Sequence, residues 1–185
     1  MAFGGFLSEG DIEKIIARVQ VRKLAALENA LDEGEIAHEV YFVDKGILRV
    51  FSLAQSGEEV TKYFVRPNQF IVELESFYNF SPSDATFQAV VDTQLLIITR
   101  PVWRELLEEI PKFFILTKSL TEITLLNKLK DNDFLNFGTA RDKYREFLRR
   151  YPDLARDVPL QQIASYLKIT PQSLSRIRKQ ISEEG

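Results

Sequence analysis

Residues 158–185 read VPLQQIASYLKITPQSLSRIRKQISEEG, and this stretch predicts two short helices joined by a tight turn. Apolar residues recur three or four positions apart, so each predicted helix has one apolar side. Thr170 is placed to cap the second helix, and Pro171 then occupies its first position. Small Ala164 allows the two helices to cross closely. The apolar positions are Ile163, Ala164 and Leu167 in the first helix and Leu174, Ile177 and Ile181 in the second.

The other side of the second predicted helix is polar and basic. This pattern is typical of a helix that enters the DNA major groove, where polar side chains reach base edges and cations contact phosphates. Arg176 can donate two hydrogen bonds to guanine, and Gln172 can pair with adenine. A helical hairpin with a solvated basic face is the alternative interpretation. The candidate DNA-binding residues are Thr170, Gln172, Ser173, Ser175, Arg176, Arg178 and Lys179.

The charge distribution favours the DNA-binding interpretation more than the net charge does. The whole chain has a net charge of −3. Residues 1–138 hold 14 Lys and Arg against 21 Asp and Glu, a net charge of −7, whereas residues 139–185 hold 10 against 6, a net charge of +4. Such asymmetry indicates that the C-terminal segment meets a polyanion. A surface of this charge is also common in proteins that bind no nucleic acid.

Composition excludes several classes of protein. The chain of 185 residues is 45% hydrophobic, enough for a buried core, and has no cysteine and a single histidine, His38. Disulfides, thiolate zinc sites and multi-histidine metal sites are therefore excluded. The carboxylate pair Glu73 and Glu75 has no histidine, cysteine or glycine-rich phosphate loop around it, so we expect no catalytic residues and no enzyme.

No apolar run approaches the roughly 20 residues that span a bilayer. The N-terminus also lacks the basic region and apolar core of a secretory signal. We therefore expect no membrane association and a location in the cytoplasm.

Between about Val21 and Thr99 the sequence is rich in short β-type runs separated by turn signals. This spacing predicts an antiparallel sandwich or barrel. The alternation around Arg49 predicts that its side chain faces water. Before this region, Ser8 and Asp11 predict the capped start of a short helix that runs to about Val19. The predicted strands are His38–Val43, Ile47–Leu53, Val60–Val65, Thr86–Val91 and Gln94–Thr99.

Residues 112–137 form a long predicted helix with a heptad-like seam. A second apolar face carries Leu125, Leu126 and Leu129, so the helix needs two partners. One is the sheet domain and the other a second copy of the chain, which predicts a homodimer; the alternative is that the stripe packs only on its own sheet. A polar Asn127 in the seam can fix the register of pairing. The seam residues are Leu116, Leu120, Ile123 and Asn127.

Gly138 and Thr139 predict a hinge, after which a basic amphipathic helix covers residues 140–151. The predicted fold class is therefore α+β. Residues 1–111 form an antiparallel sensor domain, residues 112–137 a dimerisation helix, and residues 138–185 an all-helical domain with the helix-turn-helix.

Three segments in this order resemble the Crp/Fnr family of bacterial regulators, the catabolite activator protein and its relatives. GEIAHEVYFVDKGILRVF (34–51) is similar to the signature of the cyclic-nucleotide-binding jelly roll, and QFIVELESF (69–77) resembles its phosphate-binding cassette. IASYLKITPQSLSRIRK (163–179) resembles its recognition motif in a form similar to Bacteroidetes-type members. The resemblance implies a homodimeric transcription regulator that reads a pseudo-palindromic operator in double-stranded DNA, with RNA polymerase as a further partner.

Carried over by position, the family's base-contacting arginine falls on Arg176, and the contacts before it fall on Pro171 and Gln172. Proline cannot replace a basic residue, so the base preference should differ from that of the catabolite activator. Lys168 stands where the family usually has a glycine in the turn, and a lysine there is strained if the turn needs a positive φ. The segment PDLARDV (152–158) leaves little or nothing of the family's β-hairpin wing.

The effector cassette departs further from the family pattern. Glu73 fits the acidic residue that accepts from the ribose hydroxyl, but Val72 stands at the glycine position and the arginine position falls on Ser83 or Asp84. A phosphate would meet no cation there and would be repelled by carboxylates. A solvated or turn-bonding role for Glu73 is favoured. The cassette positions are Val72, Glu73, Leu74, Ser83 and Asp84.

The resemblance therefore implies a regulator with no cofactor and an unknown effector other than cyclic AMP. The alternative function is a sensor or protein-interaction module of the same fold that binds no DNA.

Overall fold

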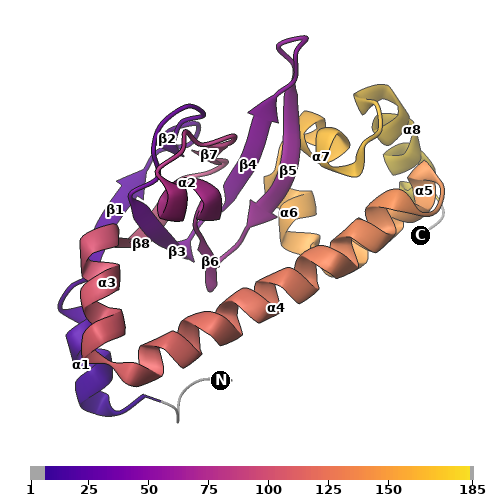
Figure 1. Ribbon diagram of the computed structural model, residues 1–185. Coiled ribbons are helices and arrows are strands. Elements are labelled where there is room, and N and C mark those ends of the chain that lie inside the picture. The colour runs from indigo at the N-terminus through magenta and orange to yellow at the C-terminus, as the bar shows by residue number, and fades with distance from the viewer. Residues whose placement is uncertain (1–6, 184–185) are drawn as a thin grey trace.

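In the computed structural model, which describes residues 7–183, two antiparallel sheets are followed by a long helix and a group of shorter helices (Figure 1). The predicted domain limits 1–111 and 138–185 include residues 1–6 and 184–185, which lie outside the described residues. The architecture is the expected one: a mixed α+β chain with a jelly-roll-like sandwich, a long helix and C-terminal helices.

The sandwich consists of two four-stranded sheets, with strand orders β1-β8-β3-β6 and β2-β7-β4-β5. Every strand pairing is antiparallel. Consecutive strands such as β3 and β4 lie in different sheets, so the chain crosses between the sheets as it does in a jelly roll. The strands are β1 Gln20–Leu24, β2 Asn29–Leu31, β3 Glu39–Lys45, β4 Leu48–Leu53, β5 Glu59–Val65, β6 Gln69–Ile71, β7 Thr86–Ala89 and β8 Thr93–Thr99.

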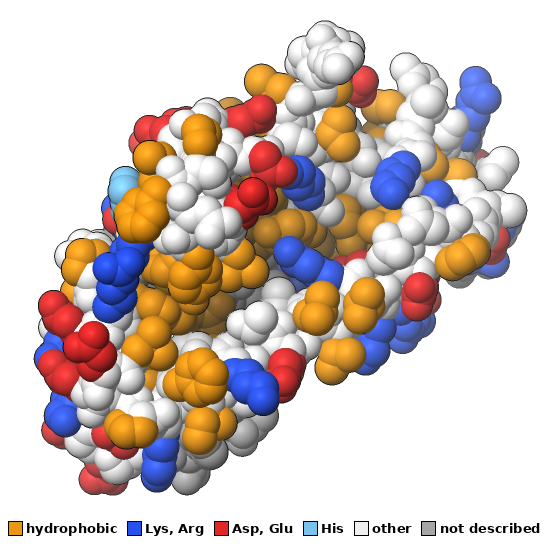
Figure 2. All heavy atoms as spheres, in the orientation of Figure 1, with side chains coloured by type: hydrophobic (Ala, Val, Ile, Leu, Met, Phe, Trp, Pro, Cys, Tyr) orange, Lys and Arg blue, Asp and Glu red, His pale blue; other side chains and the backbone are white. Residues whose placement is uncertain are grey.

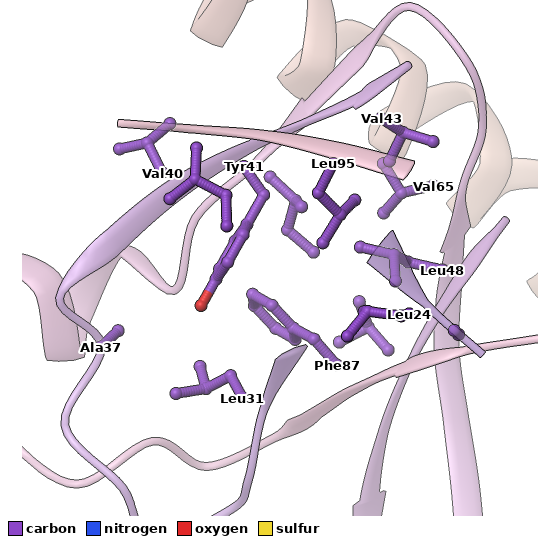
Figure 3. Close-up of a cluster of buried hydrophobic side chains, with 14 of the residues drawn as sticks. Leu24, Leu31, Ala37, Val40, Tyr41, Val43, Leu48, Val65, Phe87 and Leu95 are labelled. Carbon is purple, nitrogen blue, oxygen red and sulfur yellow. The ribbon is translucent and has the colours of Figure 1, made fainter. Parts of the chain in front are cut away.

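The main core lies between the two sheets (Figure 3). The rings of Tyr41 and Phe87 meet edge to face, with their centroids 6.1 Å apart. The hydroxyl of Tyr41 donates to the carbonyl oxygen of Ala30 at 3.0 Å, so this large buried residue has its polar end satisfied. Leu48 and Leu95 are fully buried beside them.

The five predicted strands each correspond to one strand of the structure, with limits that differ by one or two residues. The sequence pattern did not reveal β1, β2 and β6, which are at most five residues long and each begin with a polar residue. The predicted capping box is present at the start of α1 (Glu9–Ile16), where the Ser8 hydroxyl accepts from the Asp11 amide at 3.2 Å. This helix ends at Ile16 and does not continue to Val19.

The prediction that Arg49 faces water is wrong. Its side chain is only 3% exposed. The guanidinium Nε donates to the Thr61 hydroxyl at 2.8 Å, and Nη1 pairs with the Glu59 carboxylate at 2.5 Å. The outer face of β4 is therefore covered, because strand β5 brings these partners across the sheet and a C-terminal helix packs on β5.

Helices α3 and α4 begin at the two predicted prolines, Pro101 in the first turn of α3 and Pro111 at the start of α4. Gly138 has a φ of 86°, a backbone conformation that suits glycine. It lies between α4 and α5, at the position where the sequence predicted a hinge. The helices after α1 are α2 Leu74–Asn79, α3 Arg100–Glu109, α4 Pro111–Asn136, α5 Ala140–Arg150, α6 Pro152–Asp157, α7 Leu160–Leu167 and α8 Pro171–Ser182.

The segment that replaces the family's wing is helical. Residues 152–157 form α6, whose Leu154 is buried in the C-terminal core. Among the described residues, no strand lies between α5 and α7. Likewise, no helix within residues 7–183 combines the length and the apolar character that crossing a bilayer requires.

Candidate functional site

The turn between α7 and α8 is built around Lys168. This residue has φ 56° and ψ 45°, the left-handed conformation that the sequence predicted would strain it. The amide of Lys168 donates to the Ser165 carbonyl at 3.1 Å, and the amide of Ile169 donates to the Ala164 carbonyl at 3.0 Å. These bonds satisfy the last carbonyls of α7 and redirect the chain into α8.

Helix α8 begins where the sequence predicted. The Thr170 hydroxyl accepts from the amide of Ser173 at 3.1 Å, and Pro171 occupies the first helical position. A proline there loses no hydrogen bond, because the first amides of a helix have no partner within it. The local sequence therefore sets both the start and the direction of α8.

The apolar side of α8 is buried against α7 and α5. Ala164 and Leu174 are fully buried, in line with the expected close crossing of the two helices. The ring of Phe147 on α5 lies 5.9 Å from the ring of Tyr166 on α7, between centroids. Helices α5 to α8 thus share one core, which we call the C-terminal unit, and this core holds α8 by its apolar side.

The opposite side of α8 is exposed. With 3.6 residues per turn, Gln172, Arg176 and Lys179 project from the same side of the helix. Lys179 lies 3.9 Å from the carboxylate of Glu183, a solvent-exposed pair that stabilises little. Of the seven predicted DNA-binding residues, the exposed ones are Thr170, Gln172, Ser175, Arg176, Arg178 and Lys179.

The structure does not bring all seven predicted residues to one face. Ser173 is half-buried, and its hydroxyl accepts from the Thr170 hydroxyl at 2.9 Å, so it belongs to the cap of α8. Arg178 is exposed, but it lies two positions after Arg176, roughly 200° further around the helix, so it projects from a different side of α8. Burial raises the pKa of Tyr144 on α5, and the positive charge of Arg178 offsets part of that rise.

The C-terminal unit is docked on the sandwich, a contact that the sequence did not reveal. The amide of Thr61 on β5 donates to the Ser165 hydroxyl at 2.9 Å, and that hydroxyl donates to the Glu59 carbonyl at 3.2 Å. The rings of Phe64 and Tyr166 lie 5.5 Å apart between centroids. Residues about a hundred positions apart meet here, and no spacing within the sequence signals that.

A second connection runs through Asp131 near the end of α4. Its carboxylate accepts from the hydroxyls of Tyr151 at 2.5 Å and Tyr166 at 3.1 Å, and from Arg150 Nη1 at 3.2 Å. Burial raises the pKa of both tyrosines, with a further contribution from the Asp131 charge, so both hydroxyls stay protonated and donate. Asp131 lines a cavity of about 250 Å³ between α4, the sandwich and the C-terminal unit.

The cassette residues adopt structural roles. The Glu73 carboxylate caps α2 by accepting from the Ser76 amide at 2.5 Å, which is the turn-bonding role that the sequence favoured. Ser83 is buried, and its hydroxyl donates to the Ala85 carbonyl at 2.7 Å. Leu74 is half exposed and Val72 half-buried.

The cassette segment 69–84 itself contains no lysine or arginine. The fold adds two lysines from distant elements. Lys62 Nζ on β5 pairs with the exposed Asp84 carboxylate at 2.8 Å. Lys128 Nζ on α4 lies 3.8 Å from the centroid of the Tyr63 ring. Sequence spacing could not find them, because β5 and α4 are brought to the cassette only by the fold.

The predicted seam of α4 divides between two environments. Leu116 packs against the cluster formed by α3 and its neighbours, and Leu120 is half-buried. Ile123 and Asn127 are exposed, as are Leu126 and Leu129 from the predicted second face. Packing on the chain's own sandwich therefore accounts for only the first half of the predicted seam.

Comparisons with known proteins find the same fold elsewhere. Residues 21–110 match the family model of the cyclic nucleotide-binding domain, which covers β1 to α3. A comparison with curated protein sequences finds no match. The match and the fold together show a cyclic nucleotide-binding-type domain, followed in this chain by a long helix and a unit of short helices.

Solved structures extend the similarity beyond that domain. FixK2 from Bradyrhizobium japonicum matches with a TM-score of 0.78 and 19% identity, over 90% of this chain and 86% of FixK2. The c-di-GMP-responsive global regulator CLP of Xanthomonas campestris matches with a TM-score of 0.74 and 16% identity, over 96% and 93% of the two chains.

The Thermus thermophilus catabolite activator protein matches with a TM-score of 0.54 and 22% identity, over 99% of this chain and 87% of that protein. At these identities the likeness concerns the fold. The chain is structurally similar to Crp/Fnr regulators along nearly its whole length.

Replacing Lys168 by glycine should stabilise the C-terminal unit, because glycine adopts the left-handed conformation without a Cβ penalty. We expect Lys168→Gly to be more stable than Lys168→Ala by about 1 kcal/mol. The alanine variant is the matched control, since both variants lose the hydrogen bond from Lys168 Nζ to Asn136. Urea unfolding measures the difference, and an alanine variant as stable as the glycine variant would show that the turn is unstrained.

Proposed function

We propose that this chain is a DNA-binding transcription regulator of the Crp/Fnr type. The observation that carries the proposal is the exposed polar and basic side of α8, whose apolar side is anchored in a helix-turn-helix core. In this proposal the protein acts in the cytoplasm as a homodimer, with double-stranded DNA and RNA polymerase as partners. Its similarity in fold to regulators supports a non-enzymatic role.

Recognition would place the N-terminal half of α8 in the major groove. Arg176 is long enough to donate two hydrogen bonds to one guanine, while Gln172 lies one turn earlier and can pair with adenine. Lys179 lies nearer the end of the helix, where a flexible ammonium suits a phosphate. The cap residues Thr170 and Ser173 serve the helix and hold its N-terminus, so their contribution to binding is indirect.

The homodimer is supported by the exposed apolar residues of α4. Ile123, Leu126 and Leu129 are about half exposed, and the whole segment 121–130 is exposed in this chain. A contiguous apolar stripe of this kind marks an interaction surface. A second α4 packed there would form a two-stranded coiled coil, with two copies of α8 about 34 Å apart, one turn of DNA. Such a pair reads a pseudo-palindrome.

The proposed effector is not cyclic AMP. The carboxylate that the ribose hydroxyl would need is engaged in capping α2, and Val72 places a branched side chain where the family allows close backbone approach. Lys62 is already paired with Asp84, so it is not free to neutralise a phosphate. A cyclic phosphate entering this cassette would lose a charge-assisted hydrogen bond worth roughly 1.5–3 kcal/mol.

Substituting Arg176 and Lys179 separates base reading from phosphate contact. Arg176→Ala should weaken binding to a selected operator by roughly 1–3 kcal/mol and relax the preference at one base pair. Lys179→Ala should weaken binding to all sequences alike and reduce the salt dependence. Fluorescence anisotropy at several salt concentrations measures both effects, with Lys45→Ala on the distant β3 as control. If the wild type shows no salt-dependent DNA binding, the alternative function without DNA binding is correct.

Charges placed in the exposed stripe of α4 should yield monomers. Ile123→Lys with Leu126→Lys would bury two ammonium groups at the proposed dimer contact, at a cost of several kcal/mol. Sedimentation velocity at micromolar concentration measures the state, with Leu53→Lys as control because Leu53 is equally exposed but lies on β4. A wild-type protein that sediments as a monomer would exclude the dimer.

Calorimetric titration tests the proposed effector selectivity. We expect cyclic AMP and cyclic GMP to bind with dissociation constants well above the low micromolar range, because the cassette segment itself carries no cation and Val72 hinders close backbone approach. Glu73→Gln serves as a control: it removes the carboxylate charge and should leave the weak nucleotide binding weak. Tight binding of either nucleotide by the wild type would mean that Lys128 or a residue of a second copy supplies the missing charge.

A further inference from the structure

A large cavity lies between the sandwich and helix α4. It has a volume of about 600 Å³, which is within the range of small-molecule sites. In the space-filling view a hollow with hydrophobic side chains at its wall separates α4 from the sheet domain (Figure 2). The aromatic wall residues are Tyr63, Phe70, Phe77, Tyr78, Trp103 and Phe114.

The wall has few charged groups, and most of them are already paired. Glu122 lies 3.8 Å from Lys118 on the next turn of α4. Lys128 differs: among the described residues it makes no ion pair, and its ammonium rests against the face of the Tyr63 ring. Although its side chain still reaches solvent, partial burial lowers the pKa of Lys128. The ammonium group of Lys128 thus has no carboxylate partner among the described residues.

A second polar group at the wall also lacks a partner. The indole N–H of Trp103 is buried and donates to no acceptor among the described residues. A buried donor without an acceptor is uncommon and costs free energy. The cavity therefore combines a large aromatic surface, which includes the Trp103 ring, with one ammonium group that makes no ion pair among the described residues.

The cavity wall includes none of the three stripe residues proposed for dimerisation, Ile123, Leu126 and Leu129, although it includes Leu120 of the predicted seam. Thr117, Thr121 and Lys128 line it from one side of α4. Ile123 is not among the wall residues and projects from the other side of the same helix. A second copy packed on the outer stripe would leave the cavity facing its own sandwich, so the cavity is available to a small molecule.

We propose that this cavity binds an apolar organic anion: a compound with an aliphatic or aromatic body and a single carboxylate or similar group. The body packs against Phe77 and Trp103, and the anionic group pairs with Lys128. A cyclic nucleotide fits this surface poorly, because its purine edge and ribose hydroxyls need several polar partners. The inference deepens the proposed function by naming the effector class of the sensor domain.

Intrinsic fluorescence tests the proposal, because Trp103 is the only tryptophan of the chain and lies in the cavity wall. The full chain is titrated with decanoate, with decanol as its neutral counterpart and with decylamine as its cationic one. Decanoate should change the emission of Trp103 with saturation and bind at least about tenfold more tightly than decanol, because a charge-assisted bond is lost in decanol. Decylamine should bind more weakly still.

Three variants locate the site. Lys128→Met should reduce the affinity for decanoate to that for decanol and leave decanol binding unchanged. Lys130→Met removes a lysine of the same helix outside the wall and should change neither. Thr121→Phe adds an aromatic ring to the cavity and should weaken both ligands.

Decanoate binding no better than decanol overturns the proposal, as does a preference that survives Lys128→Met. Displacement of decanoate by cyclic AMP at low micromolar concentration would overturn the ligand class. Binding confined to the monomeric double variant of Ile123 and Leu126 would show that a second copy occupies the cavity. The titrations contain no DNA, so a failure of DNA binding and a failure of ligand binding are separate results.

Discussion

Helix α4 has apolar residues on more sides than its own chain can cover, and the rest of the structure is arranged around this constraint. At its start Phe113 is buried with α3, and near its end Leu135 is buried in the C-terminal core. Between them, residues 121–130 are all exposed. Each apolar side chain left in water forgoes roughly 25 cal/mol per Å² of burial. The proposed dimer and the proposed ligand both cover parts of this one helix.

The same helix joins the cavity to the C-terminal unit. Lys128 lies at the cavity wall, and Asp131 is one turn further along. The Asp131 carboxylate accepts from the hydroxyls of Tyr151, at the junction of α5 and α6, and of Tyr166 on α7. Residues three apart are neighbours on a helix. The proposed ligand at Lys128 would therefore lie within one helical turn of the Asp131 contacts with the C-terminal unit.

Most helices and strands could be predicted because their signals are local. The cap at Thr170 and the prolines of α3 and α4 each depend on neighbouring residues, whereas the left-handed Lys168 was inferred from the glycine of the resembled family. Arg49 shows where such reasoning fails. Alternation along one strand places it toward water, but Thr61 and Glu59 on the next strand bind its guanidinium, and the C-terminal unit covers that face of the sheet.

From the sequence alone came the α+β order of elements and the two helices with their tight turn, since these depend on residue spacing, capping and turn chemistry within a few positions. The altered cassette came from the resemblance to a family. Tertiary structure alone decided which cations stand near the cassette, which side of α4 lines the cavity, and how the C-terminal unit docks. Lys128 meets Tyr63, and Ser165 meets Thr61, across 65 and 104 positions of the chain. Contacts between such distant residues arise from packing of whole elements, and packing leaves no periodic signal in the sequence.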